Sequence, residues 1–171
     1  VSANGRFAID SATGEVTVAD GTQLDYEAAT SHTITVRVTD ASGATYDENF
    51  TVTLTDVNEF STTAISDTNA ALNSVAESAA NGTVVGITAY ATDSDATTNT
   101  IVYTLDSDAG GLFAINGTTG IVTVAGALDY ETAISHSITV RATSADGSFS
   151  TQAFTINVTD VNESGVTAIS D

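Results

Sequence analysis

The chain has 171 residues, of which 22 are acidic and three are arginine or lysine, so its formal charge at pH 7 is −19. This charge would repel nucleic acid and anionic membrane surfaces, and it makes soluble cations the natural counterpart. The chain has no cysteine or methionine, which suits an extracellular protein but leaves no disulfide framework to hold the fold. No apolar run approaches the ~20 residues of a membrane span.

Short segments with alternating polarity recur along the chain and predict β-strands. In residues 32–39 the apolar side chains of Ile34, Val36 and Val38 alternate with polar ones. Other segments are rich in β-branched residues and lie between clusters of Gly, Asn, Asp and Ser. In chain order, strands are expected at residues 32–39, 50–55, 83–90, 100–105, 121–124, 137–143 and 154–159. No stretch has a helical period, so the pattern predicts an all-β, immunoglobulin-like Greek-key β-sandwich.

The sequence also repeats itself. Residues 24–27 (L-D-Y-E) and 56–59 (D-V-N-E) return 104 residues later, at 128–131 and 160–163. This period is too long for a solenoid repeat and matches the size of a separate domain, so the fold should be a string of tandem beads. We expect an excerpt of a longer array, in which 1–59 is the C-terminal half of a repeat, 60–163 is a complete repeat and 164–171 opens a third.

Acidic residues gather in the loops between the predicted strands. Ca²⁺ takes six to eight oxygen ligands from carboxylates, amides and carbonyls, and the ends of a sandwich bring such loops together. For any single aspartate a solvated surface is the simpler explanation, but the recurrence of the set at the same positions favours metal binding. The candidate ligands are Asp25, Glu27, Asp56, Asn58, Glu59, Glu77, Asp93, Asp95, Asp129, Glu131, Asp160, Asn162 and Glu163.

Other polar and aromatic residues are given structural roles. Tyr26 and Tyr130 are expected to pack behind the L-D-Y-E loops, and His32 and His136 to begin equivalent strands without binding metal. The remaining aspartates outside the repeated motifs are interpreted as turn residues. They are Asp10, Asp20, Asp47, Asp67, Asp106 and Asp108.

Six short motifs follow one another in the complete repeat. They are V-A-E at 75–77, A-T-D-S-D at 91–95, F-A-I-N-G-T-T-G at 113–120, L-D-Y-E at 128–131, V-R-A-T-S at 140–144 and D-V-N-E at 160–163. In this order they resemble the motifs of cadherin domains, and more closely the cadherin-like repeats of giant bacterial surface proteins. The resemblance implies a cadherin-like sandwich with calcium between consecutive domains.

The resemblance also implies which residues share each junction. The first would use Asp25, Glu27, Asp56, Asn58 and Glu59 with Asp93 and Asp95 of the following unit. The second would use Glu77, Asp129, Glu131, Asp160, Asn162 and Glu163, together with ligands from a unit outside this sequence.

The sequence departs from the family pattern in three places. The last two positions of the D-x-N-D-N linker are Glu59 and Phe60 in one repeat and Glu163 and Ser164 in the other. The aspartate of V-x-A-x-D is kept as Asp40 but becomes Ser144 in the complete repeat, with Asp146 two residues on. We therefore expect fewer than the family's three ions at the first junction, about two. The absence of tryptophan excludes adhesion by exchange of a strand with an inserted Trp.

These patterns predict an extracellular, calcium-rigidified extender of a secreted bacterial adhesin, whose partners are the neighbouring repeats of the same chain. The alternative is a calcium-dependent carbohydrate- or protein-binding module that recognises a glycan or another surface protein. An enzyme is not expected, because the paired carboxylates are accounted for as metal ligands. Neither a Ser-His-Asp set nor a phosphate-binding loop accompanies them.

Overall fold

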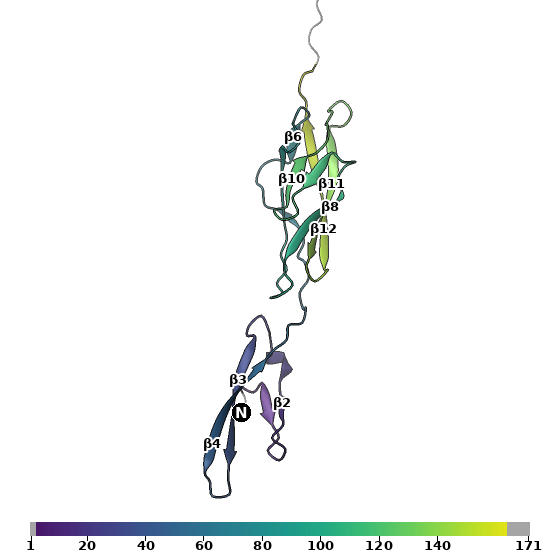
Figure 1. Ribbon diagram of the computed structural model, residues 1–171. Coiled ribbons are helices and arrows are strands. Elements are labelled where there is room, and N and C mark those ends of the chain that lie inside the picture. The colour runs from purple at the N-terminus through teal and green to yellow at the C-terminus, as the bar shows by residue number, and fades with distance from the viewer. Residues whose placement is uncertain (1–2, 164–171) are drawn as a thin grey trace, which may run out of the picture. The chain divides into compact units, whose positions relative to one another are not determined.

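The computed structural model describes residues 3–163 (Figure 1). The chain divides into two compact units, Val1–Glu59 and Phe60–Asp171. Each unit is described below by itself. The expected start of a third repeat, at 164–171, lies outside the described residues.

The second unit is a sandwich of two four-stranded sheets (Figure 1). One sheet has the order β5-β7-β10-β9 and the other β6-β12-β11-β8. The strands are β5 (Ser66–Asp67), β6 (Ser74–Ala76), β7 (Val84–Tyr90), β8 (Ile101–Ser107), β9 (Phe113–Ile115), β10 (Ile121–Val124), β11 (Ser135–Ser144) and β12 (Phe149–Thr159). Neighbouring strands are antiparallel, except that β6 pairs with β12 in parallel. The predicted all-β sandwich is confirmed.

Alternating residues from both sheets form the core of this unit. Ile87 of β7 and Val122 of β10 face Ile138 and Val140 of β11, and all four side chains are fully buried. Burial of an aliphatic side chain of this size contributes about 1.5–3 kcal/mol, so these β-branched positions account for much of the stability. The acidic loops lie at the ends of the strands that this core holds in place.

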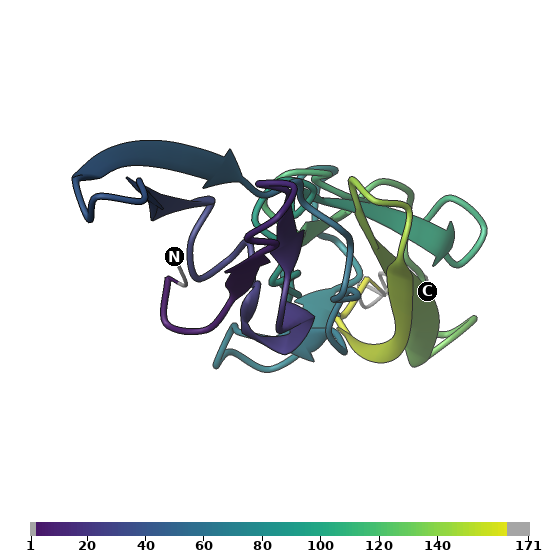
Figure 2. The same cartoon turned by 90° about the horizontal axis from the view of Figure 1, so that it is seen from below.

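The first unit holds two two-stranded sheets, β1-β2 and β3-β4. They are formed by β1 (Phe7–Ile9), β2 (Val16–Val18), β3 (Ser31–Thr39) and β4 (Thr45–Thr53), with a 3₁₀ turn at Gly21–Gln23. Both views show the dark-blue β3-β4 hairpin extending beyond the purple β1-β2 pair (Figure 2). In the second unit the equivalent strands β11 and β12 are flanked by β8 and β6.

The apolar face of the first unit is consequently only partly covered. Val16 is 37% exposed, whereas Val122 at the equivalent position of the second unit is 0% exposed. Likewise, Phe50 is 51% exposed. An apolar hollow of about 360 Å³ is lined by Gly14, Val16, Ile34, Val36, Phe50 and Val52.

Several strand boundaries differ from the prediction. β4 and β12 begin at Thr45 and Phe149, each five residues earlier than the residue ranges 50–55 and 154–159. Residues 45–49 lack an apolar alternation, and they become strand because each pairs across the hairpin with a residue of β3. The short strands β1, β2, β5, β6 and β9 have two or three residues each and were not predicted as strands.

The aspartates interpreted as turn residues divide into two groups. Asp10, Asp20 and Asp108 accept backbone N–H bonds in turns, as predicted. The prediction is wrong for Asp47 and Asp106, which lie within β4 and β8. Their carboxylates form ion pairs of 2.7 Å with Arg37 and Arg141 respectively. Opposite charges that face each other on neighbouring strands explain this placement.

Asp67 combines both features, because it lies in β5 and its Oδ1 accepts the backbone N–H of Thr88 on the neighbouring strand as well as that of Asn69 two residues on. The predicted structural role of the histidines agrees with their surroundings. The ring of His32 lies 6.1 Å from that of Phe7, and the ring of His136 lies 5.9 Å from that of Phe113. Tyr130 packs against the core, as expected.

Candidate metal centres

Glu77 organises the acidic end of the second unit. It follows directly on β6 and is 5% exposed. Its Oε2 accepts the backbone N–H of Tyr130 at 2.6 Å, and its Oε1 accepts the backbone N–H of Val161 at 2.6 Å. One buried carboxylate therefore holds the L-D-Y-E loop and the D-V-N-E segment together, although they lie far apart in the sequence.

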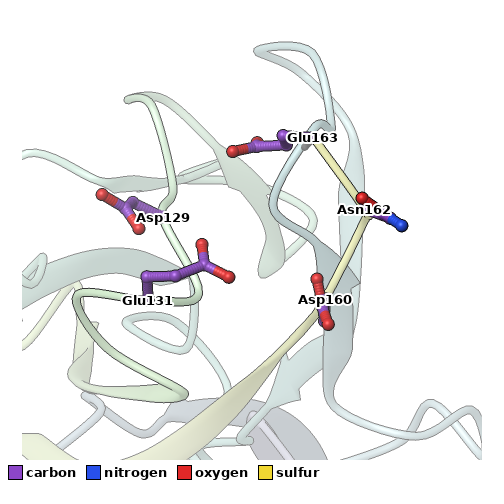
Figure 3. A pocket seen from close by; sticks show the side chains of 5 residues that line it. All are labelled: Asp129, Glu131, Asp160, Asn162 and Glu163. Atoms are coloured by element: carbon purple, nitrogen blue, oxygen red, sulfur yellow. The ribbon is translucent and has the colours of Figure 1, made fainter. Parts of the chain in front are cut away.

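The carboxylates of Glu77, Asp129 and Glu131 form one candidate site. Each offers an oxygen within 4.8 Å of the others. Next to them is a hollow of about 490 Å³ lined by Asp129, Glu131, Asp160, Asn162 and Glu163 (Figure 3). Figure 3 shows the carboxylates of Glu131 and Glu163 extending into the space between loop and segment, whereas the amide of Asn162 points away from it.

This site has a strongly negative potential. The pKa of Glu163 is raised above its usual value, mainly by repulsion from Glu77, then by burial and by Glu131, Asp129 and Asp160. In contrast, the pKa of Asp129 is lowered, because its carboxylate accepts bonds from the hydroxyl and backbone N–H of Thr132. A group of carboxylates that offers several hard oxygen donors is suited to a divalent cation such as Ca²⁺.

A second group lies in the same unit and combines the loop that follows β7 with the turn between β11 and β12. Asp93 and Asp95 are 8% and 0% exposed, and each has an oxygen within 4.8 Å of the other and of Asp146. The Oδ2 of Asp93 is buried and accepts no hydrogen bond. A buried carboxylate oxygen without such a partner is costly unless a cation compensates it.

The loop that carries Asp93 is held by a buried tyrosine. Tyr103 of β8 is 6% exposed, and its hydroxyl accepts the backbone N–H of Ala91 at 3.0 Å. Thr92 is fixed in turn by Thr63, whose Oγ1 accepts the Thr92 N–H at 2.8 Å. The first residues of the loop are thus positioned before any ligand arrives.

A third group lies in the first unit. Glu27, Asp56 and Glu59 offer oxygens within 4.8 Å of one another. Asp25 lies outside this group, and its Oδ1 accepts the backbone N–H of Ala28 at 3.0 Å. Asn58 is exposed. The equivalent of Glu77 would belong to strands that the first unit does not show within residues 3–59.

The structure thus brings most of the predicted residues into three groups of carboxylates. One residue that the sequence prediction omitted, Asp146, joins a group. The family motif has an aspartate at the position of Ser144, and the signal in the sequence was the acidic residue two positions later. Spacing alone could not show that the hairpin turns this side chain toward Asp93 and Asp95.

Comparison with known proteins identifies the family. The model of the cadherin domain matches residues 72–159. The chain belongs to the cadherin domain family. It is 40% identical to human Protocadherin Fat 4 over 141 residues and 35% identical to rat Cadherin-23 over 147 residues. These alignments cover 81% and 82% of this chain but only 3% and 4% of the two relatives.

Solved cadherin structures have the same fold. The crystal structure of mouse Cadherin-23 EC22-24 aligns with a TM-score of 0.77 and 28% identity over 93% of this chain and 51% of that chain. The Protocadherin GammaB4 extracellular domain aligns with a TM-score of 0.74 and 25% identity over 92% of this chain and 25% of that chain.

Membership of the family has direct consequences. Cadherin domains are extracellular adhesion modules and not enzymes, they occur as tandem repeats, and they generally bind Ca²⁺. The carboxylate groups of this cadherin chain could form such sites. Within residues 3–163 there is no helix whose length and hydrophobicity would let it span a membrane.

Proposed function

We propose that this cadherin chain is a calcium-rigidified extender of an extracellular adhesion protein, with Ca²⁺ bound where consecutive repeats meet. The observation that carries the proposal is the group formed by Glu27, Asp56 and Glu59, whose oxygens lie within 4.8 Å of one another. Two of these residues belong to the D-V-N-E segment at the end of the first unit. A cation held there would fix the segment through which one repeat continues into the next.

Electrostatics supplies the reason for rigidity. Without a cation, the grouped carboxylates repel one another, and the segments that carry them lose ordered contacts. A cation that binds only the ordered arrangement stabilises it by mass action. Calcium suits the role better than magnesium, because Ca²⁺ accepts six to eight oxygens in flexible geometry whereas Mg²⁺ requires near-ideal octahedral geometry.

The proposed ligands follow the order of the repeats. For the first junction they are Asp25, Glu27, Asp56, Asn58, Glu59, Asp93 and Asp95, and for the second they are Glu77, Asp129, Glu131, Asp160, Asn162 and Glu163. The three carboxylate groups support this assignment for eight of these residues. Asp160, Asn162 and Glu163 are supported by their place around the hollow beside the Glu77 group. For Asp25 and Asn58 the support is the family motif alone.

The proposed source is a bacterial surface adhesin. This part of the proposal rests on the sequence motifs and the acidic, cysteine-free composition. The relatives compared above are animal proteins. They support an extracellular adhesion role, but they do not support a bacterial source. The proposed partners are the neighbouring repeats of the same chain. A glycan-binding role is less well supported, because the chain has no tryptophan to form an aromatic platform.

Distances between spin labels test the extender function. The chain contains no cysteine, so Ser11→Cys and Ser107→Cys place one label on an exposed residue of each unit. In millimolar Ca²⁺ the distance distribution should be narrow, and in chelator or in equal Mg²⁺ it should be broad. The variant Glu27→Gln/Asp56→Asn should stay broad in Ca²⁺. Equal widths in all conditions would show that calcium does not rigidify the chain.

A further inference from the structure

The carboxylate that accepts backbone N–H groups in the equivalent hairpin turn comes from a different position in each unit. In the first unit, Asp40 at the end of β3 accepts the backbone N–H groups of Ser42 and Ala44 through its Oδ1, at 2.8 and 2.9 Å. In the complete repeat the position of Asp40 is held by Ser144. The hairpin N–H equivalent to that of Ala44 belongs to Ser148, and it donates to Asp146 Oδ1 at 2.7 Å. The carboxylate of the hairpin has therefore moved two residues along the chain.

The moved carboxylate reaches the acidic loop. Asp146 has an oxygen within 4.8 Å of oxygens of Asp93 and Asp95. Asp93 is 8% exposed, and its Oδ2 is buried and accepts no hydrogen bond. These three carboxylates, one of which has a buried oxygen that accepts no hydrogen bond, form a set of hard donors that a divalent cation would satisfy.

The side chain of Ser144 holds the loop that carries Asp93 and Asp95. It is 3% exposed, and its hydroxyl donates to the carbonyl of Thr98 at 2.7 Å. Thr98 lies in the loop that carries Asp93 and Asp95, so the serine holds the far end of that loop. An aspartate at 144 would be ionised at neutral pH and could not donate this bond. In this unit Ser144 therefore supplies the hydrogen-bond donor, and Asp146 supplies the carboxylate that the motif has at position 144.

The same hairpin also holds the start of the repeat. Ser148 Oγ accepts the backbone N–H of Thr62 at 3.0 Å, and Thr62 Oγ1 donates to the Ser148 carbonyl at 3.0 Å. A ligand two residues from Ser148 would connect cation binding to the segment that leads into the sandwich.

We propose that Asp146 is a calcium ligand of the Asp93–Asp95 group in this repeat, in place of the aspartate that the motif puts at position 144. The inference rests on the proposed calcium-binding function and adds a ligand to it. Ser144 is a positioning residue, because it acts through the Thr98 carbonyl and brings no charge to the cation.

Calorimetric titration of the 171-residue chain with Ca²⁺ tests this assignment. Asp146→Asn keeps an oxygen that can accept the Ser148 N–H but removes the charge, and it should weaken one class of sites at least tenfold. Asp108→Asn is the matched control. Asp108 also accepts backbone N–H bonds in a turn, from Gly110 and Gly111, yet lies outside the acidic groups, so calcium affinity should be unchanged.

Two further readouts separate ligation from a structural role. The melting temperature of Asp146→Asn in chelator should equal or exceed that of the unaltered chain, because a repulsive charge is removed, while its rise with calcium should be smaller. Adding Ser144→Asp to Asp146→Asn should restore part of the lost affinity, because it returns a carboxylate to the motif position. Both results would support ligation.

Unchanged calcium affinity in Asp146→Asn would overturn the assignment of Asp146 alone. A lower melting temperature of Asp146→Asn in chelator with an unchanged rise in calcium would show a turn-capping role, and would overturn it too. If the unaltered chain took up no calcium at millimolar concentration, the proposed function itself would fail, which distinguishes the two failures.

Discussion

Buried and half-buried carboxylates carry most of the chemistry in this chain, and Glu77 shows how one of them serves both fold and site. Its two oxygens each accept a backbone N–H at 2.6 Å, from Tyr130 and Val161. It also lies within 4.8 Å of oxygens of Asp129 and Glu131. Glu77 therefore orders the loop and the segment whose carboxylates would share a cation with it.

Glu77→Gln should destabilise the second unit even without metal. The amide would turn an N–H₂ toward one of the two backbone N–H groups and leave that donor unsatisfied, at a cost of about 1–3 kcal/mol. The measurement is the free energy of unfolding by denaturant in chelator. Glu131→Gln, which changes an exposed member of the same group, should leave this free energy equal or higher. Equal losses in both variants would contradict the role given to Glu77.

The ion pair between Asp106 and Arg141 predicts a pH dependence. The hydrogen bond from Arg141 lowers the pKa of Asp106 below 3.8. Because the folded pKa is the lower one, the pair stabilises the fold above about pH 4, and this stabilisation is lost as the pH falls through the folded pKa. The difference in unfolding free energy between the unaltered chain and Asp106→Asn should therefore shrink toward pH 2. Since the pair is partly exposed, the difference is small. A difference that does not change with pH would contradict this account.

Among the elements, the start of β10 depends on a glycine. Gly120 has φ +69°, and a Cβ there would lie 2.1 Å from the carbonyl oxygen of Ala89. Its own carbonyl accepts the Ala89 N–H at 2.9 Å. Only a residue without a side chain lets β10 approach β7 this closely, so Gly120 is a packing requirement of the second unit.

Gly120→Ala should lower the melting temperature far more than Gly82→Ala. Both glycines have positive φ, so each alanine bears a backbone cost of order 1–3 kcal/mol. Only at Gly120 does the added methyl group also meet a backbone carbonyl, whereas nothing lies within 4 Å of a Cβ at Gly82. Thermal unfolding of the two variants, under the same conditions, gives the comparison. Equal shifts would mean that the approach of β10 to β7 is less tight than described.

The elements also show what the sequence could predict. Long strands with regular alternation, such as β3 and β11, were predicted within two residues of their ends, because alternation reports burial on one face. The polar beginning of β4 was missed, since it becomes strand only through pairing with β3. The acidic loops could be recognised because their motifs recur. Asp146 could not, since its place in the group depends on the path of a hairpin turn.

At the scale of the whole chain, the formal charge of −19 and the three carboxylate groups favour the same conclusion. The cost of bringing these carboxylates together must be offset, and the chain has only three basic side chains, two of which pair with Asp47 and Asp106 outside the groups. The divalent cation proposed above would offset this cost. Folding and rigidity should therefore both depend on calcium.

Thermal unfolding of the 171-residue chain, with Ca²⁺ titrated against a chelator and Mg²⁺ as comparison, tests this claim most directly. A single site at one hundred times its dissociation constant adds about 2.7 kcal/mol. For a unit of about 100 residues this corresponds to a rise in melting temperature of roughly 10–20 °C. We predict a rise of at least this size with Ca²⁺ and a much smaller one with Mg²⁺. An equal melting temperature in Ca²⁺ and chelator would contradict the account and reduce the acidic groups to a solvated surface.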